Sequence, residues 1–182
     1  RTGSSISEEV FSRLSNTLTL CITAEFVAVA IGLILGVIAA SRRGGIADTL
    51  SSVFAVVTQG LPVFWIGMLL LLIFAYNLGW FPLGHSEPPE WAIHGRPANF
   101  LVELAVRLWH LFLPALTLVI ISVGGYVLLT RASMLEVLSE DYLVTLRAKG
   151  LSETKILFKH ALKNASLPII TQVAIAFAFT LS

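Results

Sequence analysis

The sequence predicts an all-α fold, a polytopic transmembrane helical bundle. Of its 182 residues, 56% are apolar and only 13% are charged, whereas about a quarter of a soluble domain is charged. The apolar residues also gather into runs of about 20 or more, the length a helix needs to cross the roughly 30 Å hydrocarbon layer of a membrane. The lipid bilayer is therefore the expected surroundings. The formal net charge is only +1, which gives no bulk electrostatic attraction to nucleic acid or acidic substrates.

Four apolar runs are the candidate spans. Three are complete, and the fourth reaches the last residue of the chain; they cover about 14–40, 50–76, 108–130 and 167–182. The chain begins with Arg1 rather than methionine, and Ser182 falls inside an apolar run. We therefore expect residues 1–182 to be a fragment of one longer transmembrane domain, with further helices in the parts not included.

The distribution of lysine and arginine predicts the orientation of these spans. Segments 41–49 and 131–166 lie on one side and hold eight of the twelve basic residues, whereas 1–13 and 77–107 lie on the other side and hold four. Basic loops remain in the cytoplasm. We therefore expect the loop at about 131–166 to be cytoplasmic.

Small residues in the first span predict close helix packing. Gly32 and Gly36, with alanines at 24, 28 and 40, recur every four residues. Such a stripe allows another helix backbone to approach closely. Lining of a transport pathway is the alternative interpretation.

Two features inside the spans are candidates for a pathway. Gln59-Gly60-Leu61-Pro62 places a helix breaker within the second span, which predicts a kink or break of the kind also found at transport sites. Gly124-Gly125 suggests a similar kink or break in the third span. Glu25 is the only carboxylate well inside a span, and its charge must face the bundle interior or water. A pathway role for Glu25, Gln59 and Pro62 and a hydrogen-bonded structural role for Glu25 both remain open.

The loop at 131–166 is amphipathic and predicts two helices. A helix over 139–149 has acidic residues at its start and basic residues at its end, and Gly150 suits a left-handed cap. A second helix is expected from Ser152 to just before Pro168, which would open the next span. A hairpin resting on the lipid surface is one interpretation.

The loop contains four short motifs: Asp141-Tyr142, Arg147-Ala148-Lys149-Gly150-Leu151-Ser152, His160-Ala161-Leu162-Lys163-Asn164-Ala165 and Leu167-Pro168. These motifs resemble the EAA loop of ABC-importer permeases, in the form typical of the dipeptide, oligopeptide and nickel permease family. Further upstream segments also resemble that family, whereas Ser15 stands where the family commonly has proline.

The resemblance implies a type I ABC importer permease in a bacterial or archaeal inner membrane. It implies a loop that seats on ATPase subunits holding ATP and Mg, a second permease chain that is identical or related, and an extracytoplasmic solute-binding protein. The solute would be a di- or oligopeptide or a related small solute. The residues that the resemblance assigns to the ATPase-coupling loop are Asp141, Tyr142, Arg147, Ala148, Lys149, Gly150, Leu151, Ser152 and Pro168.

Nucleotide chemistry is expected in a separate chain. The sequence has no G-x-x-x-x-G-K-[ST] motif, so it cannot hold phosphates by a P-loop. It also has neither a recognisable catalytic motif nor the spacing of metal ligands. We expect a transporter subunit with no cofactor of its own rather than an enzyme. An ion-gradient-driven transporter and a membrane enzyme using Glu25 are the alternatives.

Overall fold

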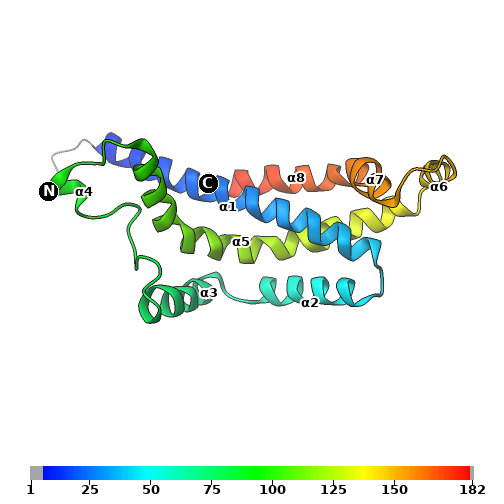
Figure 1. Cartoon of the computed structure of the whole chain (residues 1–182), viewed down its shortest axis with the longest axis horizontal. Helices are drawn as coiled ribbons and strands as arrows, with labels where there is room; N and C mark the ends of the chain where they lie inside the picture. Colours follow the sequence, from blue (N-terminus) through cyan, green and yellow to red (C-terminus); the bar gives the residue numbers. More distant parts are fainter. Residues whose placement is uncertain (1–5, 181–182) are drawn as a thin grey trace. The chain divides into compact units, whose positions relative to one another are not determined.

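The computed structural model describes residues 6–180, which form helices and loops without any strand. The all-α fold predicted from composition is therefore confirmed for this part of the chain. Figure 1 shows the helices in chain order, with η1 and η2 the two π-helical segments. The elements are α1 (Ile6–Ser41), α2 (Ile46–Gly60), α3 (Val63–Leu70), η1 (Leu71–Asn77), α4 (Trp91–His94), α5 (Phe100–Leu138), α6 (Asp141–Ala148), α7 (Glu153–Lys155), η2 (Ile156–Ala161) and α8 (Leu162–Thr180).

Three helical stretches among the described residues are long and apolar enough to cross a membrane: Arg13–Ser41, Phe100–Leu138 and Glu153–Ala178. The pair formed by α2 and the α3–η1 segment makes a fourth if it counts as one broken span. α1 has 36 residues and α5 has 39, more than the hydrocarbon layer needs. Both helices therefore extend beyond the membrane core.

The break between α2 and α3 lies where the sequence predicts it. Leu61 and Pro62 leave helical geometry, with ψ angles of 137° and 134°, and α3 begins at Val63. Proline at 62 has no N–H to continue the helix. In contrast, α5 is continuous through Gly124 and Gly125. The break expected at those glycines does not form, and Gly124 serves helix packing instead, as described below.

The chain forms two compact units, which we describe separately. The first unit comprises the described residues up to 24 and residues 62–118. Its long connection between η1 and α5 is tied down by ion pairs: Arg107 lies 2.9 Å from Glu103 and 3.5 Å from Glu87, and Arg96 lies 3.2 Å from Glu87. These pairs link the connection to the first turns of α5.

Aromatic stacking adds to the order of the first unit. The Phe81 ring stacks on Trp109 and on Phe112, with centroid separations of 4.6 and 4.7 Å. Such offset pairs contribute beyond the area that they bury. The connection at 78–99 is thus fixed to α5 by both charge and apolar contact.

The second unit comprises residues 25–61 and the described residues from 119 onward, and close helix approach through glycine organises it. A Cβ atom at Gly32 would collide with Tyr126 of α5, and one at Gly36 would lie 2.5 Å from Thr130 Cβ. A Cβ at Gly124 would lie 2.6 Å from the Ala55 carbonyl oxygen of α2. α5 therefore approaches both α1 and α2 closely because these positions lack side chains.

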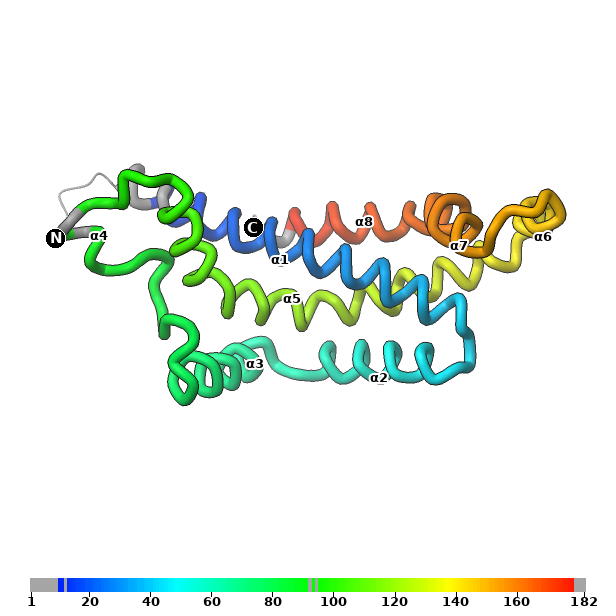
Figure 2. Tube along the Cα trace, viewed as in Figure 1, coloured from blue at the N-terminus to red at the C-terminus, as the bar shows by residue number. Residues whose placement is uncertain are grey.

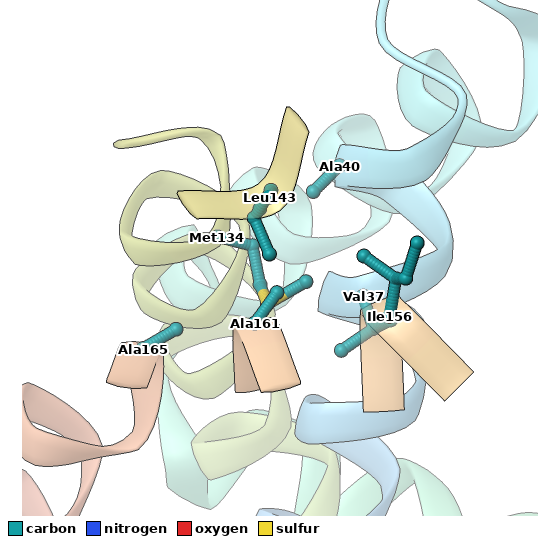
Figure 3. Packing of buried hydrophobic residues seen from close by; sticks show 7 residues of the cluster. All are labelled: Val37, Ala40, Met134, Leu143, Ile156, Ala161 and Ala165. Carbon is teal, nitrogen blue, oxygen red and sulfur yellow. The ribbon is translucent and has the colours of Figure 1, made fainter. Parts of the chain in front are cut away.

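One hydrophobic cluster in the second unit joins α6 and η2 to α1, α5 and α8. Its members come from five elements, and Figure 3 shows their side chains converging. Met134, Leu143 and Ile156 are fully buried. The cluster consists of Val37 and Ala40 from α1, Met134 from α5, Leu143 from α6, Ile156 and Ala161 from η2, and Ala165 from α8.

The helix after Gly150 differs from the prediction. The chain is helical from Glu153 to Thr180 through α7, η2 and α8, and Pro168 lies inside α8 rather than opening a new helix. Figure 2 shows the trace running from α7 into α8 without interruption. Proline removes the hydrogen bond to the carbonyl four residues earlier and crowds that carbonyl, but spanning helices tolerate both effects. The expected end of the second helix before Pro168 is therefore wrong.

Candidate functional site

The first candidate site is the α6 hairpin, which we define as residues 141–156. α6 carries Asp141 in its first turn and Arg147 in its last, the arrangement that a helix dipole favours. Gly150 follows with φ +75°, a left-handed conformation that glycine adopts without steric cost. The Gly150 N–H donates to the Arg147 carbonyl at 2.9 Å, and the Leu151 N–H donates to the Leu146 carbonyl at 3.3 Å. These bonds cap α6 and reverse the chain.

The inner side of the α6 hairpin is attached to the helices of the second unit. Leu143 and Ile156 are fully buried in the cluster of Figure 3. The Asn164 amide of α8 donates to the Tyr142 hydroxyl at 3.0 Å. Apolar burial and one hydrogen bond thus join the hairpin to α8 and to the ends of α1 and α5.

The outer side of the α6 hairpin is open and mostly charged. Val144 is 62% exposed. The Arg147 guanidinium pairs with Glu153 at 2.8 Å, and this hydrogen bond raises the pKa of Arg147, so the group stays charged. Of the residues that the resemblance assigns to the coupling loop, Pro168 lies in α8, outside the hairpin. The remainder of that set lies in the hairpin, with Asp141, Arg147, Ala148, Lys149, Gly150 and Ser152 exposed and Tyr142 and Leu151 half-buried.

An ion pair that sequence patterns do not reveal joins α5 to α2. Arg131 of α5 forms two hydrogen bonds with Asp48 of α2. The Gly44 N–H also donates to Asp48, at 2.9 Å. The pair fixes the turn between α1 and α2 to α5. Its partners are 83 positions apart, and the only sequence signal is a charged residue at the end of each of two apolar runs.

The second candidate site is a polar cavity of about 510 Å³ in the second unit. It brings together two residues singled out from the sequence, Glu25 and Gln59; Pro62 is the N-cap residue of α3. The Tyr126 hydroxyl donates a hydrogen bond to a Glu25 carboxylate oxygen. The lining of this cavity is Glu25, Gln59, Ile121, Ser122, Gly125, Tyr126, Leu129, Gln172 and Ala176.

Sequence reasoning missed three polar members of this cavity: Ser122, Tyr126 and Gln172. Each interrupts an apolar run, and a polar group inside a span is the signal that could have found them. Metal binding has no support from the described residues, which contain no group of three or more His, Cys, Asp or Glu side chains able to hold an ion. The cavity offers polar side chains for hydrogen bonding, and the Glu25 carboxylate is its one negatively charged group.

Comparison with known proteins places residues 32–182 on the family model described as "binding-protein-dependent transport system inner membrane component". The oligopeptide transport system permease protein AppB of Bacillus subtilis (strain 168) is 37% identical over 171 residues, which are 94% of this chain and 51% of that protein. The glutathione transport system permease protein GsiC of Escherichia coli (strain K12) is 38% identical over 176 residues, 97% of this chain and 51% of that protein.

A third relative is similar in sequence over nearly the whole chain. The probable peptide ABC transporter permease protein y4tP of Sinorhizobium fredii (strain NBRC 101917 / NGR234) is 37% identical over 181 residues, 98% of this chain and 53% of that protein. The chain spans about half the length of the curated relatives it matches. The membrane-length helices, the family model and these relatives agree, and the chain belongs to the family of binding-protein-dependent transport system inner membrane components.

Proposed function

We propose that the protein containing this chain is the permease subunit of an ATP-driven, binding-protein-dependent importer, and that its α6 hairpin seats on a separate ATPase subunit. The observation that carries the proposal is the two-sided hairpin. Its inner side is buried against the helices of the second unit, whereas its outer side presents Val144 beside charged groups. An exposed apolar side chain surrounded by charge suits a protein partner.

The hairpin also has a route for passing movement to the membrane helices. Leu143 and Ile156 pack against α1 and α5, and the helix that starts at Glu153 continues into α8. Closure of the ATPase subunits on ATP would therefore displace α8 and the adjoining ends of α1 and α5 together. Alternating access between this chain and a second permease chain would follow from that displacement.

The solute we propose is a small peptide. The relatives named above carry the words oligopeptide, peptide and glutathione in their names, and all three describe short chains of amide bonds. A solute-binding protein outside the membrane would deliver the peptide, and the family description names dependence on such a protein. Family membership supports this function over an ion-gradient-driven transporter or a membrane enzyme using Glu25.

Site-specific cross-linking tests the docking proposal. Cysteine would be introduced as Val144→Cys into the full-length permease, in a background where Cys21 is replaced by alanine and other cysteines are removed. We expect a cross-link to a cysteine in the surface groove of the ATPase subunit, with a yield that changes between ATP-bound and nucleotide-free states.

Ile93→Cys is the matched control, because Ile93 is 79% exposed and lies in the connection expected on the opposite membrane side. It should react with a membrane-impermeant thiol reagent added from outside and should not cross-link to the ATPase. Absence of a Val144→Cys cross-link in the assembled transporter, or labelling of that cysteine from outside, would overturn the proposal.

A further inference from the structure

We propose that the polar cavity is a solute-contact site that recognises a primary ammonium group attached to an amide chain, as at the amino end of a peptide. This inference rests on the proposed function and adds a position and a chemistry for solute recognition. The site is formed by Glu25 of α1, Gln59 of α2, Tyr126 of α5 and Gln172 of α8.

The charge balance of the cavity favours a cationic ligand. Glu25 is its one carboxylate, and none of the described residues lining it is lysine or arginine. Glu25 lies in the stretch Arg13–Ser41, which is long and apolar enough to span a membrane. A charge at such a depth is costly unless a partner or water offsets it. A cation entering the cavity would supply a partner of opposite charge.

The geometry of Glu25 leaves room for that cation. Tyr126 donates one hydrogen bond to the carboxylate, and an ionised carboxylate has about four acceptor positions on its two oxygens. A primary ammonium group offers three donors and forms charge-assisted hydrogen bonds with a carboxylate. Tyr126 therefore orients the Glu25 carboxylate while leaving acceptor positions for a ligand.

The two glutamines supply complementary chemistry for amide bonds. Gln59 and Gln172 line the cavity from different helices. The Gln59 Nε2 donates to the Ala55 carbonyl oxygen at 3.4 Å, which leaves the Gln59 Oε1 atom to accept from a ligand N–H. Side-chain amides carry both donors and acceptors, as peptide bonds do. Glu25 would therefore bind the ammonium group of the ligand, and Gln59 and Gln172 would bind the peptide groups that follow it.

The size and apolar lining of the cavity favour a molecule over a bare ion. About 510 Å³ falls within the volume of sites for small organic ligands. Ile121, Leu129 and Ala176 supply apolar surface, which a metal cation would not use but a peptide side chain would. A Cβ atom at Gly125 would meet no other atom within 4 Å, so this glycine keeps part of the space open.

A pair of probes that differ only in the ammonium group tests the inference. The full-length permease, assembled with its partner chain, ATPase subunits and solute-binding protein, would be reconstituted in vesicles. Uptake of trialanine and of N-acetyl-trialanine would be measured with ATP for the unmodified transporter and for Glu25→Gln. We expect Glu25→Gln to lower trialanine uptake at least ten-fold and N-acetyl-trialanine uptake less than two-fold.

Three further variants make the result specific. Glu136→Gln makes the same chemical change at an exposed position of α5 outside the cavity, and it should leave the ratio of the two uptake rates unchanged. Glu25→Asp keeps the charge and should retain a preference for trialanine over N-acetyl-trialanine. This variant still tests the inference if Glu25→Gln assembles poorly. Gly125→Leu adds bulk where no protein atom interferes and should lower uptake of both probes.

The outcomes separate this inference from the proposed function. ATP-driven trialanine uptake with an unchanged probe ratio in Glu25→Gln would overturn the cavity inference and leave the importer function intact. If Glu25→Gln lowers uptake of both probes equally, and uptake no longer depends on a proton or sodium gradient, the cavity is an ion site and the inference is overturned. Absence of ATP-driven uptake of either probe by the unmodified transporter would overturn the proposed peptide-import function itself.

Discussion

Arg131 of α5 and Asp48 of α2 form a two-point ion pair, in which Arg131 Nε donates to Oδ1 of Asp48 and Nη2 donates to Oδ2 at 2.9 Å. The Asp48 side chain is 6% exposed and that of Arg131 is 29% exposed. The Gly44 backbone N–H and the Ser52 hydroxyl also donate to Asp48, at 2.9 and 3.4 Å. The turn between two spans is thus held to a third span by one carboxylate.

Removing one member of this pair should destabilise the protein. Asp48→Ala leaves the Arg131 guanidinium without its partner, and we expect a loss of about 3 kcal/mol. Chemical unfolding of the full-length permease in detergent would measure it. The double variant Asp48→Ala with Arg131→Met should cost less than Asp48→Ala alone, and Arg43→Ala, at an exposed position in the neighbouring turn, should be close to neutral. A neutral Asp48→Ala would contradict the role given to the pair.

Close approach at Gly36 predicts a second stability effect. A Cβ there would lie 2.5 Å from Thr130 Cβ and 3.0 Å from the Val127 carbonyl oxygen, so Gly36→Ala should cost about 1–3 kcal/mol through overpacking. Gly125→Ala is the matched control, because its Cβ would have no atom within 4 Å. Thermal unfolding in detergent would compare the two variants. Equal stability of both would show that α1 and α5 can separate at Gly36 without cost.

The positive φ of Gly150 predicts how strongly different substitutions at this position destabilise the turn, independently of steric clashes with neighbouring residues. No atom lies within 4 Å of a Cβ at this position, so the cost of a substitution comes from the backbone. We expect Gly150→Val to cost about 1–2 kcal/mol, Gly150→Asn less, and Gly150→Pro to abolish the turn. Limited proteolysis of the hairpin, together with ATP-driven uptake, measures the effect. If Gly150→Pro leaves uptake intact while the chain inserts normally, the docking role proposed for the hairpin fails.

The hydrogen bond from Asn164 to Tyr142 predicts a measurable link between α6 and α8. Tyr142→Phe removes the acceptor and should reduce stability by about 1 kcal/mol. Because the bond joins the hairpin to the last helix, ATP-driven uptake should fall more than stability alone explains. A double-mutant cycle with Asn164→Ala isolates this pair. A coupling energy of zero in that cycle would contradict the proposed link between α6 and α8. Tyr76→Phe, at an exposed tyrosine of η1, is the control and should change neither stability nor uptake.

The spans and the helix break followed from the sequence because each depends on local chemistry. A membrane demands long apolar helices, and Pro62 cannot continue one. Gly124 was misjudged because glycine looks the same in sequence whether it bends a helix or admits a neighbouring one. Pro168 was misjudged because a helix already supported on both sides can carry a proline.

Sequence patterns could not predict which residues far apart in the chain contact one another. Tyr126 meets Glu25 across 101 positions, and that contact depends on how α5 packs against α1 at Gly32. The carboxylate itself could be singled out, since it interrupts an apolar run, but its donor could not. Gln172 enters the cavity only because the helix carrying it is fixed by the cluster around Ala165.

The π turn of η2 lies between the hairpin and α8. Ile156–Ala161 hydrogen-bonds with wider spacing than an α-helix, so this turn holds one residue more than an α-helical turn would. Deleting a single residue within η2 would therefore restore an ordinary α-helical turn and leave the hairpin facing the same way. Each residue advances an α-helix by about 100°, so the same deletion in the first turns of α8 would rotate the hairpin about the axis of α8. A change in chain length of one residue is thus absorbed at η2 and is not absorbed in the regular helix that follows.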